Sequence, residues 1–267
     1  MSEWQGQVVI VTGASLGIGA ELARTLAAQG AKLVIAARDV ERLDHVGAAC
    51  RKAGAEVEDV AADLTVEANC RALVERAVAR FGRIDTLICN AGQAMWTRAE
   101  DVADWGIFDR LLRVNYLASV YCTLAALPHL RATKGRVVAV SSLAGKTGVP
   151  MRTGYAAAKA AVGGFFDSLR IELIGSGVSV TVVCPGFVGT GSRARNLGAD
   201  GKPLGASPVD EAAMMPVNEC VRQLLRAAAR RDRELVMTPR ARVGMWLKLI
   251  APALVDRMAA KAMERGR

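Results

Sequence analysis

Hydrophobic and polar positions alternate in blocks along most of the chain, so that short apolar runs rich in β-branched residues are followed by longer stretches with helical spacing. Short apolar runs bounded by glycine or polar residues are typical of strands buried on both faces. Strands are predicted at residues 8–11, 32–36, 57–61, 84–89, 136–140, 178–184 and 235–237. Helices are predicted at residues 18–29, 108–127 and 155–174.

This alternation predicts the fold class: α/β, with a doubly wound parallel sheet of about seven strands, Rossmann-type, and helices on both faces. At 267 residues the chain fits one domain, residues 1–267. Sheets of this kind bind ligands at the carboxyl ends of their strands, where the winding reverses. The chemistry is therefore expected in the loops that follow the strands.

Two segments depart from the alternation. Residues 187–216 show no clear period and are rich in Gly, Pro, Ser and Asp, and loops of this length are usually functional, so a substrate lid is predicted there. Residues 240–267 form an apolar and basic extension, in which Pro252 kinks or ends a helix. We expect this extension to cover the substrate cleft or pack on a partner subunit, or, as a second choice, to lie on a membrane surface.

Composition narrows the function classes. The net charge is +9, and most of the excess lies from Arg222 onward. A solvated helix face is the favoured interpretation of this excess, and an anionic membrane or an acidic carrier protein is the alternative. Nucleic-acid binding is not expected, because no aromatic stacking platform accompanies the basic tail. Two histidines are poor material for a zinc site or a serine–histidine triad, so no metal is expected. Six cysteines without Cys-x-x-Cys spacing, and an N-terminus unlike a signal peptide, predict a cytoplasmic protein with reduced thiols.

A glycine-rich turn separates the first predicted strand from the first predicted helix, with the sequence Thr-Gly-Ala-Ser-Leu-Gly-Ile-Gly from residue 12 to residue 19. Glycine lets the backbone approach a phosphate closely, and the helix that follows offers unpaired amides. The turn is not a Walker loop, because no Gly-Lys-Ser/Thr follows. It predicts cofactor contacts at Gly13, Ser15, Leu16, Gly17, Ile18 and Gly19.

The end of the second strand bears on which dinucleotide binds. An acid there favours the ribose hydroxyls of NAD, whereas a cation favours the 2′-phosphate of NADP. Arg38 is placed to meet a phosphate, and Ala37 stands where an acid would otherwise select NAD. Asp39 either pairs with Arg38 or binds ribose. The site therefore predicts NADP(H) in preference to NAD(H).

Proton chemistry is indicated by Ser142, Tyr155 and Lys159. Tyr155 and Lys159 are one helical turn apart and share a helix face, so that an ammonium lies beside a phenol. A neighbouring positive charge lowers the pKa of a phenol, and we expect Lys159 to have this effect on Tyr155. Ser142 closes a strand and can hold a substrate oxygen. The three residues predict a proton donor and acceptor that needs no histidine.

Taken in order, these motifs resemble those of a short-chain dehydrogenase/reductase of the single-domain, NADP(H)-preferring type. The resemblance covers about residues 6 to 190, some two-thirds of the chain. It is carried by the Thr-Gly-x-x-x-Gly-x-Gly turn, Asp63, Asn90-Ala91-Gly92, Asn115, Ser142 with Tyr155-x-x-x-Lys159, and Pro185-Gly186 with Thr190.

The resemblance implies further roles. Asp63 would bind the adenine ring and Leu64 would be a neighbouring cofactor contact. Lys159 would also hold the ribose hydroxyls, and Asn115 would anchor a water that links Lys159 to solvent. It also implies a homo-oligomer, either a dimer or a tetramer. The other implied cofactor contacts are Asn90, Ala91 and Gly92 in the cleft, Pro185, Gly186 and Thr190 at the nicotinamide carboxamide, and Val188.

The expected function is an NADP(H)-dependent oxidoreductase that interconverts an apolar ketone or aldehyde and its alcohol, with Tyr155 as general acid and base. Met95, Trp96, Val149 and Phe187 are the predicted walls of the substrate pocket, because small-molecule sites are mostly apolar.

Thr147 and Arg152 offer polarity of unknown orientation. The alternatives are a reductase of 3-oxoacyl thioesters on an acidic carrier protein, which the basic tail would suit, and a non-catalytic NADP sensor. Such sensors tend to lose the tyrosine or the lysine, and this chain keeps both.

Overall fold

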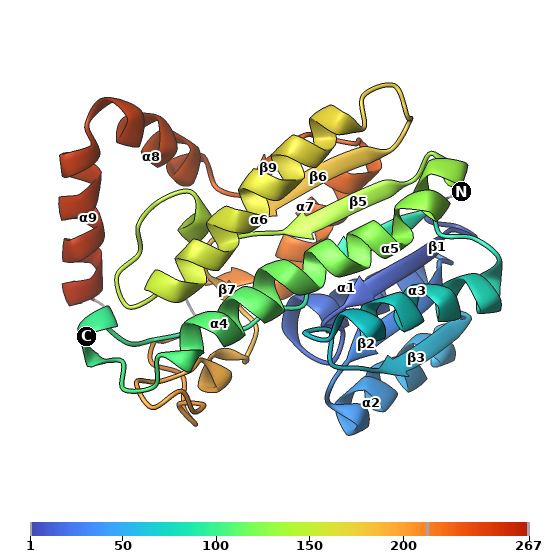
Figure 1. Ribbon diagram of the computed structural model, residues 1–267, viewed down its shortest axis with the longest axis horizontal. Helices are drawn as coiled ribbons and strands as arrows, with labels where there is room; N and C mark the ends of the chain where they lie inside the picture. The colour runs from blue at the N-terminus through green and yellow to red at the C-terminus, as the bar shows by residue number, and fades with distance from the viewer. Residues whose placement is uncertain (1, 212–213, 266–267) are drawn as a thin grey trace.

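The computed structural model describes residues 2–211 and 214–265. Its centre is a parallel sheet with the strand order β3-β2-β1-β4-β5-β6-β9 (Figure 1). β1 pairs with both β2 and β4, so the winding reverses between β1 and β4. The strands are β1 (Val8–Thr12), β2 (Lys32–Ala37), β3 (Val57–Ala61), β4 (Thr86–Cys89), β5 (Arg136–Val140), β6 (Ser179–Cys184) and β9 (Glu234–Val236).

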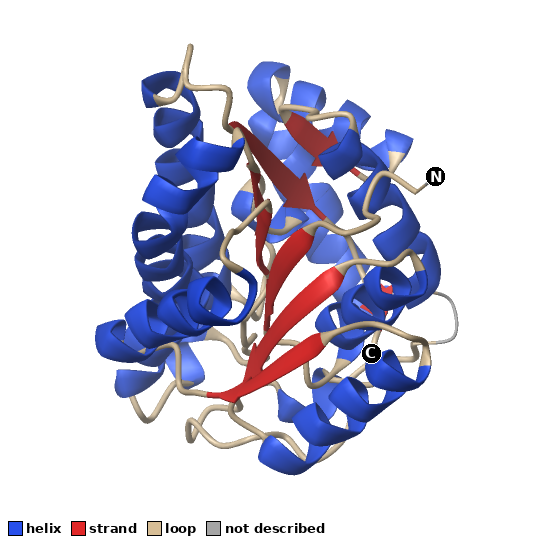
Figure 2. Ribbon diagram, turned by 90° about the vertical axis from the view of Figure 1, so that its right-hand side faces the viewer, coloured by secondary structure: helices blue, strands red, loops and turns tan. Residues whose placement is uncertain are grey.

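Helices cover both faces of the sheet (Figure 2). Successive strand residues point to opposite faces, so Val9 and Val11 pack in one core and Ile10 packs in the other. The first core contains α1 (Gly17–Ala28), α2 (Val40–Lys52) and α7 (Val217–Ala229); the second contains α3 (Glu67–Phe81), α5 (Ala118–Thr133) and α6 (Thr153–Glu172). The predicted doubly wound parallel sheet is therefore confirmed.

The helix predicted at residues 108–127 is longer than expected. It runs as α4 (Gly106–Leu112), a π-helical turn (Arg113–Leu117) and then α5. Within the described chain, Gly106–Thr133 is the one helix long and apolar enough to cross a membrane, but half of its apolar window is buried inside the fold. The strand predicted at residues 84–89 begins only at Thr86.

Of the two irregular segments, residues 187–216 lie between β6 and β9 in the sequence, and the C-terminal extension comes after β9. Residues 187–216 contain β7 (Val188–Gly189) paired with β8 (Met215–Pro216), and Leu197 bridges to Met95 and Pro203. The C-terminal extension forms α8 (Pro239–Ile250) and α9 (Pro252–Arg265), and it projects from one side of the body (Figure 1). Three short 3₁₀ turns occur at Ala99–Asp101, Leu143–Gly145 and Arg193–Arg195.

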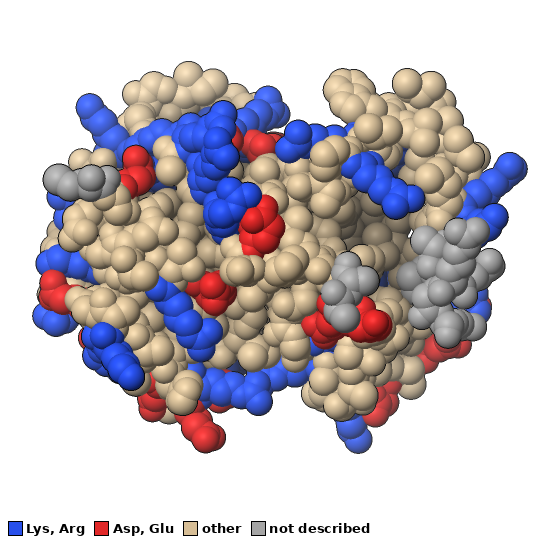
Figure 3. All heavy atoms as spheres, turned by 180° about the vertical axis from the view of Figure 1, so that it is seen from behind, with Lys and Arg blue, Asp and Glu red and all other residues tan. Residues whose placement is uncertain are grey.

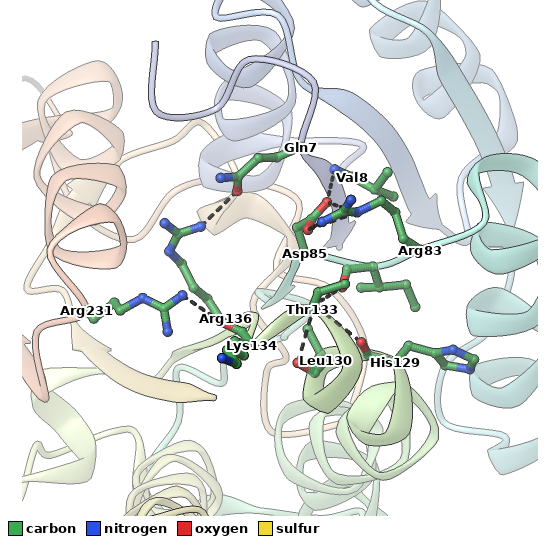
Figure 4. Close-up of polar contacts among 11 residues, drawn as sticks. Gln7, Val8, Arg83, Asp85, His129, Leu130, Thr133, Lys134, Arg136 and Arg231 are labelled. Atoms are coloured by element: carbon green, nitrogen blue, oxygen red, sulfur yellow. Dashed lines mark hydrogen bonds and ion pairs between the residues drawn. The ribbon is translucent and has the colours of Figure 1, made fainter. Parts of the chain in front are cut away.

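Polar side chains tie together the amino ends of the central strands (Figure 4). Buried Asp85 accepts a 2.9 Å hydrogen bond from the amide of Val8 and pairs with Arg83. Buried Arg136 donates to the side chain of Gln7 over 2.8 Å. These bonds join β1, β4 and β5 at the amino ends of the strands, and the cavity described below lies at their carboxyl ends.

Candidate active site

A cavity of about 690 Å³ opens at the carboxyl ends of β1, β2, β4, β5 and β6. The four residues predicted to act in catalysis all line it, as do all of the predicted cofactor contacts except Gly19. The cavity therefore gathers side chains that are far apart in the sequence, and it does so where the sheet reverses its winding.

The glycine-rich turn brings free amides to this cavity. Gly13 and Gly17 have φ values of +67° and +55°, which favour glycine, and a Cβ on Gly13 would lie 2.7 Å from the Cα of Ala91. Leu16, the N-cap of α1, makes no side-chain capping bond, and the first turn holds no acid. The amide of Ala14 donates to the carbonyl oxygen of Ala36, but the amides at the start of α1 are available to a phosphate group.

Gly19 has a different role from the one predicted. It is buried and does not line the cavity. A Cβ there would lie 2.1 Å from the carbonyl oxygen of Gly13. Gly19 therefore lets the first turn of α1 pack against the glycine-rich turn, and the prediction that it contacts the cofactor is corrected.

Asn90 braces the same turn from the end of β4. Its Nδ2 donates to the carbonyl oxygens of Thr12, at 2.9 Å, and Gly13, at 3.2 Å. The amides of Asn90 and Ala91 both donate to Thr12 Oγ1. These bonds join the ends of β1 and β4, and so fix the floor of the cavity.

At the end of β2, Arg38 is exposed, lines the cavity and has no hydrogen bond or ion pair within residues 2–211 and 214–265. Asp39 does not pair with it. Asp39 caps α2 by accepting from the amide of Arg42 and forms ion pairs with Arg42 and Arg195. The guanidinium of Arg38 is therefore available to an anion.

Asp63 and Leu64 follow β3 and also line the cavity. The Asp63 carboxylate accepts from both the amide and the hydroxyl of Thr65, at 3.0 and 2.9 Å, in a turn that leads into α3. Part of the role of Asp63 is therefore local and structural.

Tyr155 and Lys159 lie on the cavity side of α6, and Ser142 follows β5 at the same place. Lys159 Nζ donates a 2.8 Å hydrogen bond to the carbonyl oxygen of Val140 and lies 5.8 Å from the ring centroid of Tyr155. The Ser142 hydroxyl accepts from the amide of Ala144. A phenol, an alkyl hydroxyl and an ammonium thus face one space.

Asn115 is completely buried in the π-helical turn. Its Nδ2 donates to the carbonyl oxygens of Gln93 and Leu111, at 2.8 and 2.9 Å. A Cβ on Gly92 would lie 2.6 Å from Asn115 Oδ1 and 3.5 Å from Lys159 Nζ. Glycine at position 92 therefore lets the asparagine and the lysine approach one region of the cavity.

The electrostatics differ from the expectation. Burial lowers the pKa of Lys159 to about 8, and burial raises the pKa of Tyr155. A hydrogen bond with Ser142 and the charges of Arg152 and Arg193 oppose the rise in the Tyr155 pKa. The expected lowering of this pKa by Lys159 is therefore corrected: although Lys159 lies as near to the Tyr155 ring as Arg152 does, the charges that lower the pKa are those of the arginines.

Arg152 was expected to supply polarity, but its position relative to the site could not be predicted from the sequence. It precedes Tyr155 by three residues, is only 6% exposed and lines the cavity. Its position one helical turn before Tyr155 was the available signal. Arg193, in the predicted lid, was missed altogether; it is buried and its Nη2 donates to the carbonyl oxygen of Val188.

The predicted substrate pocket is largely corrected. Phe187 lines the cavity, but Met95, Trp96 and Val149 do not. Met95 is fully buried in a small core with residues of α4, and its sulfur accepts from the amide of Gly154. Trp96 stacks on the Arg152 guanidinium, whose central carbon lies 4.9 Å from the ring centroid.

The turn at residues 190–193 is held by Glu211, which was not among the predicted site residues. One carboxylate oxygen accepts from the amides of Thr190 and Gly191, each at 2.9 Å, and the other lies 3.8 Å from Arg193 Nε. A Cβ on Gly17 would lie 3.0 Å from the Cβ of Thr190. The start of the predicted lid thus lies against the glycine-rich turn.

These residues fit a nicotinamide dinucleotide. The uncapped amides of α1 and the guanidinium of Arg38 suit phosphate groups, and the buried amine of Lys159 suits ribose hydroxyls. Such a cofactor, when bound, supplies or accepts a hydride.

Comparison with known proteins agrees with this geometry. A family model described as short chain dehydrogenase matches residues 7–199. A dehydrogenase/reductase SDR family protein 7-like of Dictyostelium discoideum is 34% identical over 266 residues, which cover 97% of this chain and 83% of that protein. An 11-beta-hydroxysteroid dehydrogenase-like 4A of Arabidopsis thaliana is 38% identical over 251 residues, or 94% and 82% of the two chains.

Two solved structures extend the comparison. A short chain dehydrogenase/reductase of Burkholderia phymatum in complex with NAD is 25% identical with a TM-score of 0.84, over 95% of this chain and 96% of that one. A metagenomic short-chain oxidoreductase in complex with NADP is 31% identical with a TM-score of 0.73, over 89% and 99%. This chain belongs to the short-chain dehydrogenase/reductase family, and it is an NAD(P)-dependent oxidoreductase that acts on CH–OH and C=O groups.

Proposed function

We propose that the chain is an NADP(H)-dependent oxidoreductase that interconverts a ketone or aldehyde with a largely apolar body and the corresponding alcohol. The observation that carries this proposal is the meeting of Ser142, Tyr155 and Lys159 with the glycine-rich turn in one cavity. The same cavity is lined by Phe187 and Val188, which offer apolar surface to a substrate.

In reduction, the Tyr155 hydroxyl gives its proton to the carbonyl oxygen while Ser142 donates a hydrogen bond to that oxygen. The raised pKa of Tyr155 keeps the phenol protonated at neutral pH, which suits the role of proton donor. Asn115 and Lys159 lie on the route by which the phenol would recover a proton from solvent. In oxidation the phenolate accepts the alcohol proton instead.

The preference for NADP(H) is supported by Arg38. Its guanidinium is exposed at the end of β2 and is not engaged by Asp39, whose carboxylate pairs with Arg42 and Arg195. A free guanidinium at this place recognises a 2′-phosphate by charge-assisted hydrogen bonds.

The test is the oxidation of NADPH in the presence of a panel of carbonyl compounds, from small aryl ketones to ketosteroids and acetoacetyl thioesters. Ketosteroids belong in the panel because relatives are named as hydroxysteroid dehydrogenases. Activity on the thioesters alone would support the 3-oxoacyl-thioester reductase, and NADPH binding without turnover of any compound would support the sensor.

Replacement of Tyr155 by phenylalanine is expected to lower kcat by about 10²–10⁴-fold while NADPH still binds. Because the pKa of Tyr155 is raised, the wild-type rate of alcohol oxidation should increase steadily with pH above neutrality, whereas carbonyl reduction should not. Steady-state rates in both directions across this pH range provide the measurement. A Tyr155→Phe enzyme that reduces ketones at the wild-type rate would refute the assignment.

For the C-terminal extension we propose contact with an anionic membrane surface. No residue in the described part of the extension lines the cavity, so the prediction that the extension covers the substrate cleft has no support. Val243, Trp246, Leu249 and Ile250 of α8 are 66% to 82% exposed, and residues 239–261 carry five Lys or Arg against Asp256 alone. Seen from behind, the end of the molecule formed by α8 and α9 is largely uncharged surface with a few cations (Figure 3).

Apolar side chains interleaved with cations complement a lipid surface of negative charge. A second copy of this chain would bring the same excess of positive charge to the interface. We also propose that the protein forms a homo-oligomer, either a dimer or a tetramer. We further propose a cytoplasmic location, which is supported by the six free, buried cysteines.

A further inference from the structure

Arg152 is a buried cation whose hydrogen-bonding groups have no partner. Its side chain is 6% exposed, and its Nε and Nη2 atoms are buried without any hydrogen bond. No carboxylate within residues 2–211 and 214–265 forms an ion pair with it. An unpaired buried guanidinium costs several kcal/mol, so proteins rarely keep one that serves only structure.

The surroundings of Arg152 stabilise its charge but offer its Nε and Nη2 donors no acceptor. The guanidinium carbon lies 4.9 Å from the ring centroid of Trp96, 5.0 Å from that of Phe187 and 5.9 Å from that of Tyr155. Ring faces attract the positive charge through the π-system, but they do not satisfy N–H donors that point along the guanidinium plane. Those donors therefore await an acceptor.

Arg193 adds a second positive charge at the same end of the cavity. Its guanidinium carbon lies 5.1 Å from the Phe187 ring centroid, and both arginines line the cavity beside Tyr155. Arg193 has partners, in the carbonyl oxygen of Val188 and the carboxylate of Glu211. The two guanidinium groups repel each other, which lowers the pKa of Arg152 beyond the effect of burial.

We propose that Arg152, supported by Arg193, is the anchor for an anionic group on the substrate, so that the preferred carbonyl compound carries a carboxylate a few bonds from the reacting carbon. This inference rests on the proposed function, because it assumes that Tyr155 protonates the carbonyl oxygen. A carboxylate would accept from the two open donors of Arg152 and restore charge balance at this end of the cavity.

The experiment compares keto acids with their neutral esters. Benzoylformate, benzoylpropionate and benzoylbutyrate differ in the spacing between carbonyl and carboxylate, and each is paired with its methyl ester. Wild-type enzyme with NADPH should prefer at least one acid over its ester by about tenfold or more in kcat/KM. In Arg152→Met this preference should disappear through a higher KM for the acid, so that the ratio of acid to ester approaches one; a change in the Tyr155 pKa caused by loss of the arginine would act on kcat for acid and ester alike.

A measurement without turnover separates this proposal from the proposed function. Each keto acid that the wild type prefers over its ester should raise the Tm of wild-type protein, and of Tyr155→Phe, but not that of Arg152→Met. Arg152→Lys, which keeps the charge, should recover part of the effect. Exposed Arg98, which pairs with Glu100 outside the cavity, gives the matched control Arg98→Met, with an unchanged ratio of acid to ester.

Three results would overturn the proposal. The first is a wild-type enzyme that treats acid and ester alike at every spacing. The second is an Arg152→Met enzyme that loses activity equally on both. The third is a loss of NADPH affinity in Arg152→Met that accounts for the whole effect, which would place the arginine on the cofactor. If wild-type protein reduces no carbonyl compound but its Tm still responds to the acids through Arg152, the proposed function fails and the anion site stands.

Discussion

At the scale of single residues, the buried charge of Lys159 lowers the stability of the folded protein. Its amine is buried, it holds one hydrogen bond to the carbonyl oxygen of Val140, and burial lowers its pKa to about 8 from an ordinary value of 10.5. Below pH 8 the native state bears the full cost of a buried ammonium. Between pH 8 and 10.5 the native state loses its proton before the unfolded state does, so the cost declines as pH rises.

Replacement of Lys159 by methionine should therefore raise the free energy of unfolding near neutral pH, by about 1–3 kcal/mol, while abolishing activity. The gain should shrink as pH rises from 8 to 10.5. Chemical denaturation at several pH values measures it, with Lys202→Met as the control for an exposed lysine. A gain that is constant across this pH range would contradict the explanation by burial.

Arg38 offers a second test at this scale. Removal of its guanidinium in Arg38→Ala should weaken NADPH binding by about 10- to 100-fold, because a charge-assisted contact to the 2′-phosphate is lost. The affinity for NADH, which lacks that phosphate, should change little. Fluorescence titration of both cofactors provides the measurement. Equal losses for the two cofactors would show that Arg38 does not select between them.

The sequence predicted which residues meet at the site, but not their electrostatics. Tyr155 and Lys159 share a face because helical spacing is a local property. The pKa of Tyr155 depends on burial and on Arg193, which lies in a different segment of the chain. The local sequence around Tyr155 therefore could not predict this pKa. The same limit explains Met95, whose apolar side chain suits a pocket and a core equally well.

At the scale of elements, strands and loop ends were well predicted, because buried parallel strands are nearly continuous apolar runs. The π-helical turn that holds Asn115 was not predicted, because the prediction treated residues 108–127 as one regular helix. α2 and α3 were not among the helices predicted by position either. Their apolar residues face one side only and are interrupted by many charges.

The C-terminal helices allow a test of the proposed membrane contact. Trp246 and Ile250 are 70% and 82% exposed on α8, so their replacement by glutamate should leave the fold intact. The double variant Trp246→Glu/Ile250→Glu should sediment with vesicles of phosphatidylserine and phosphatidylcholine much less than the wild type does. Ile174, which is 79% exposed at the end of α6, provides the control Ile174→Glu.

Binding of the wild type should also weaken as salt is added or as phosphatidylserine is removed, because the cations of the extension contribute through charge. Equal sedimentation of the wild type and the double variant would rule out these side chains as the contact. If light scattering shows that the double variant forms a smaller assembly than the wild type does, these side chains instead form an interface between copies of the chain.

At the scale of the whole molecule, the cavity joins two halves of the sheet. Arg38 and Asp63 come from the half that contains β2 and β3, whereas Ser142 and Pro185 come from the half that contains β5 and β6. Direct bonds between the halves at this end come from Asn90 and Ala91, which bond to the end of β1, and from the ion pair between Asp39 and Arg195. A bound dinucleotide would add contacts to both halves at once.

NADPH should therefore stabilise the entire fold, and not only the loops around it. At about 100 times its Kd the cofactor should add roughly 2.7 kcal/mol to the free energy of unfolding, or about 5–10 °C in Tm. NADH at the same concentration should give a smaller shift, and Arg38→Ala should remove the difference between the two. Amide exchange should show protection on β5 and β6 as well as on β1 and β2; protection confined to the glycine-rich turn would mean that the two halves open independently.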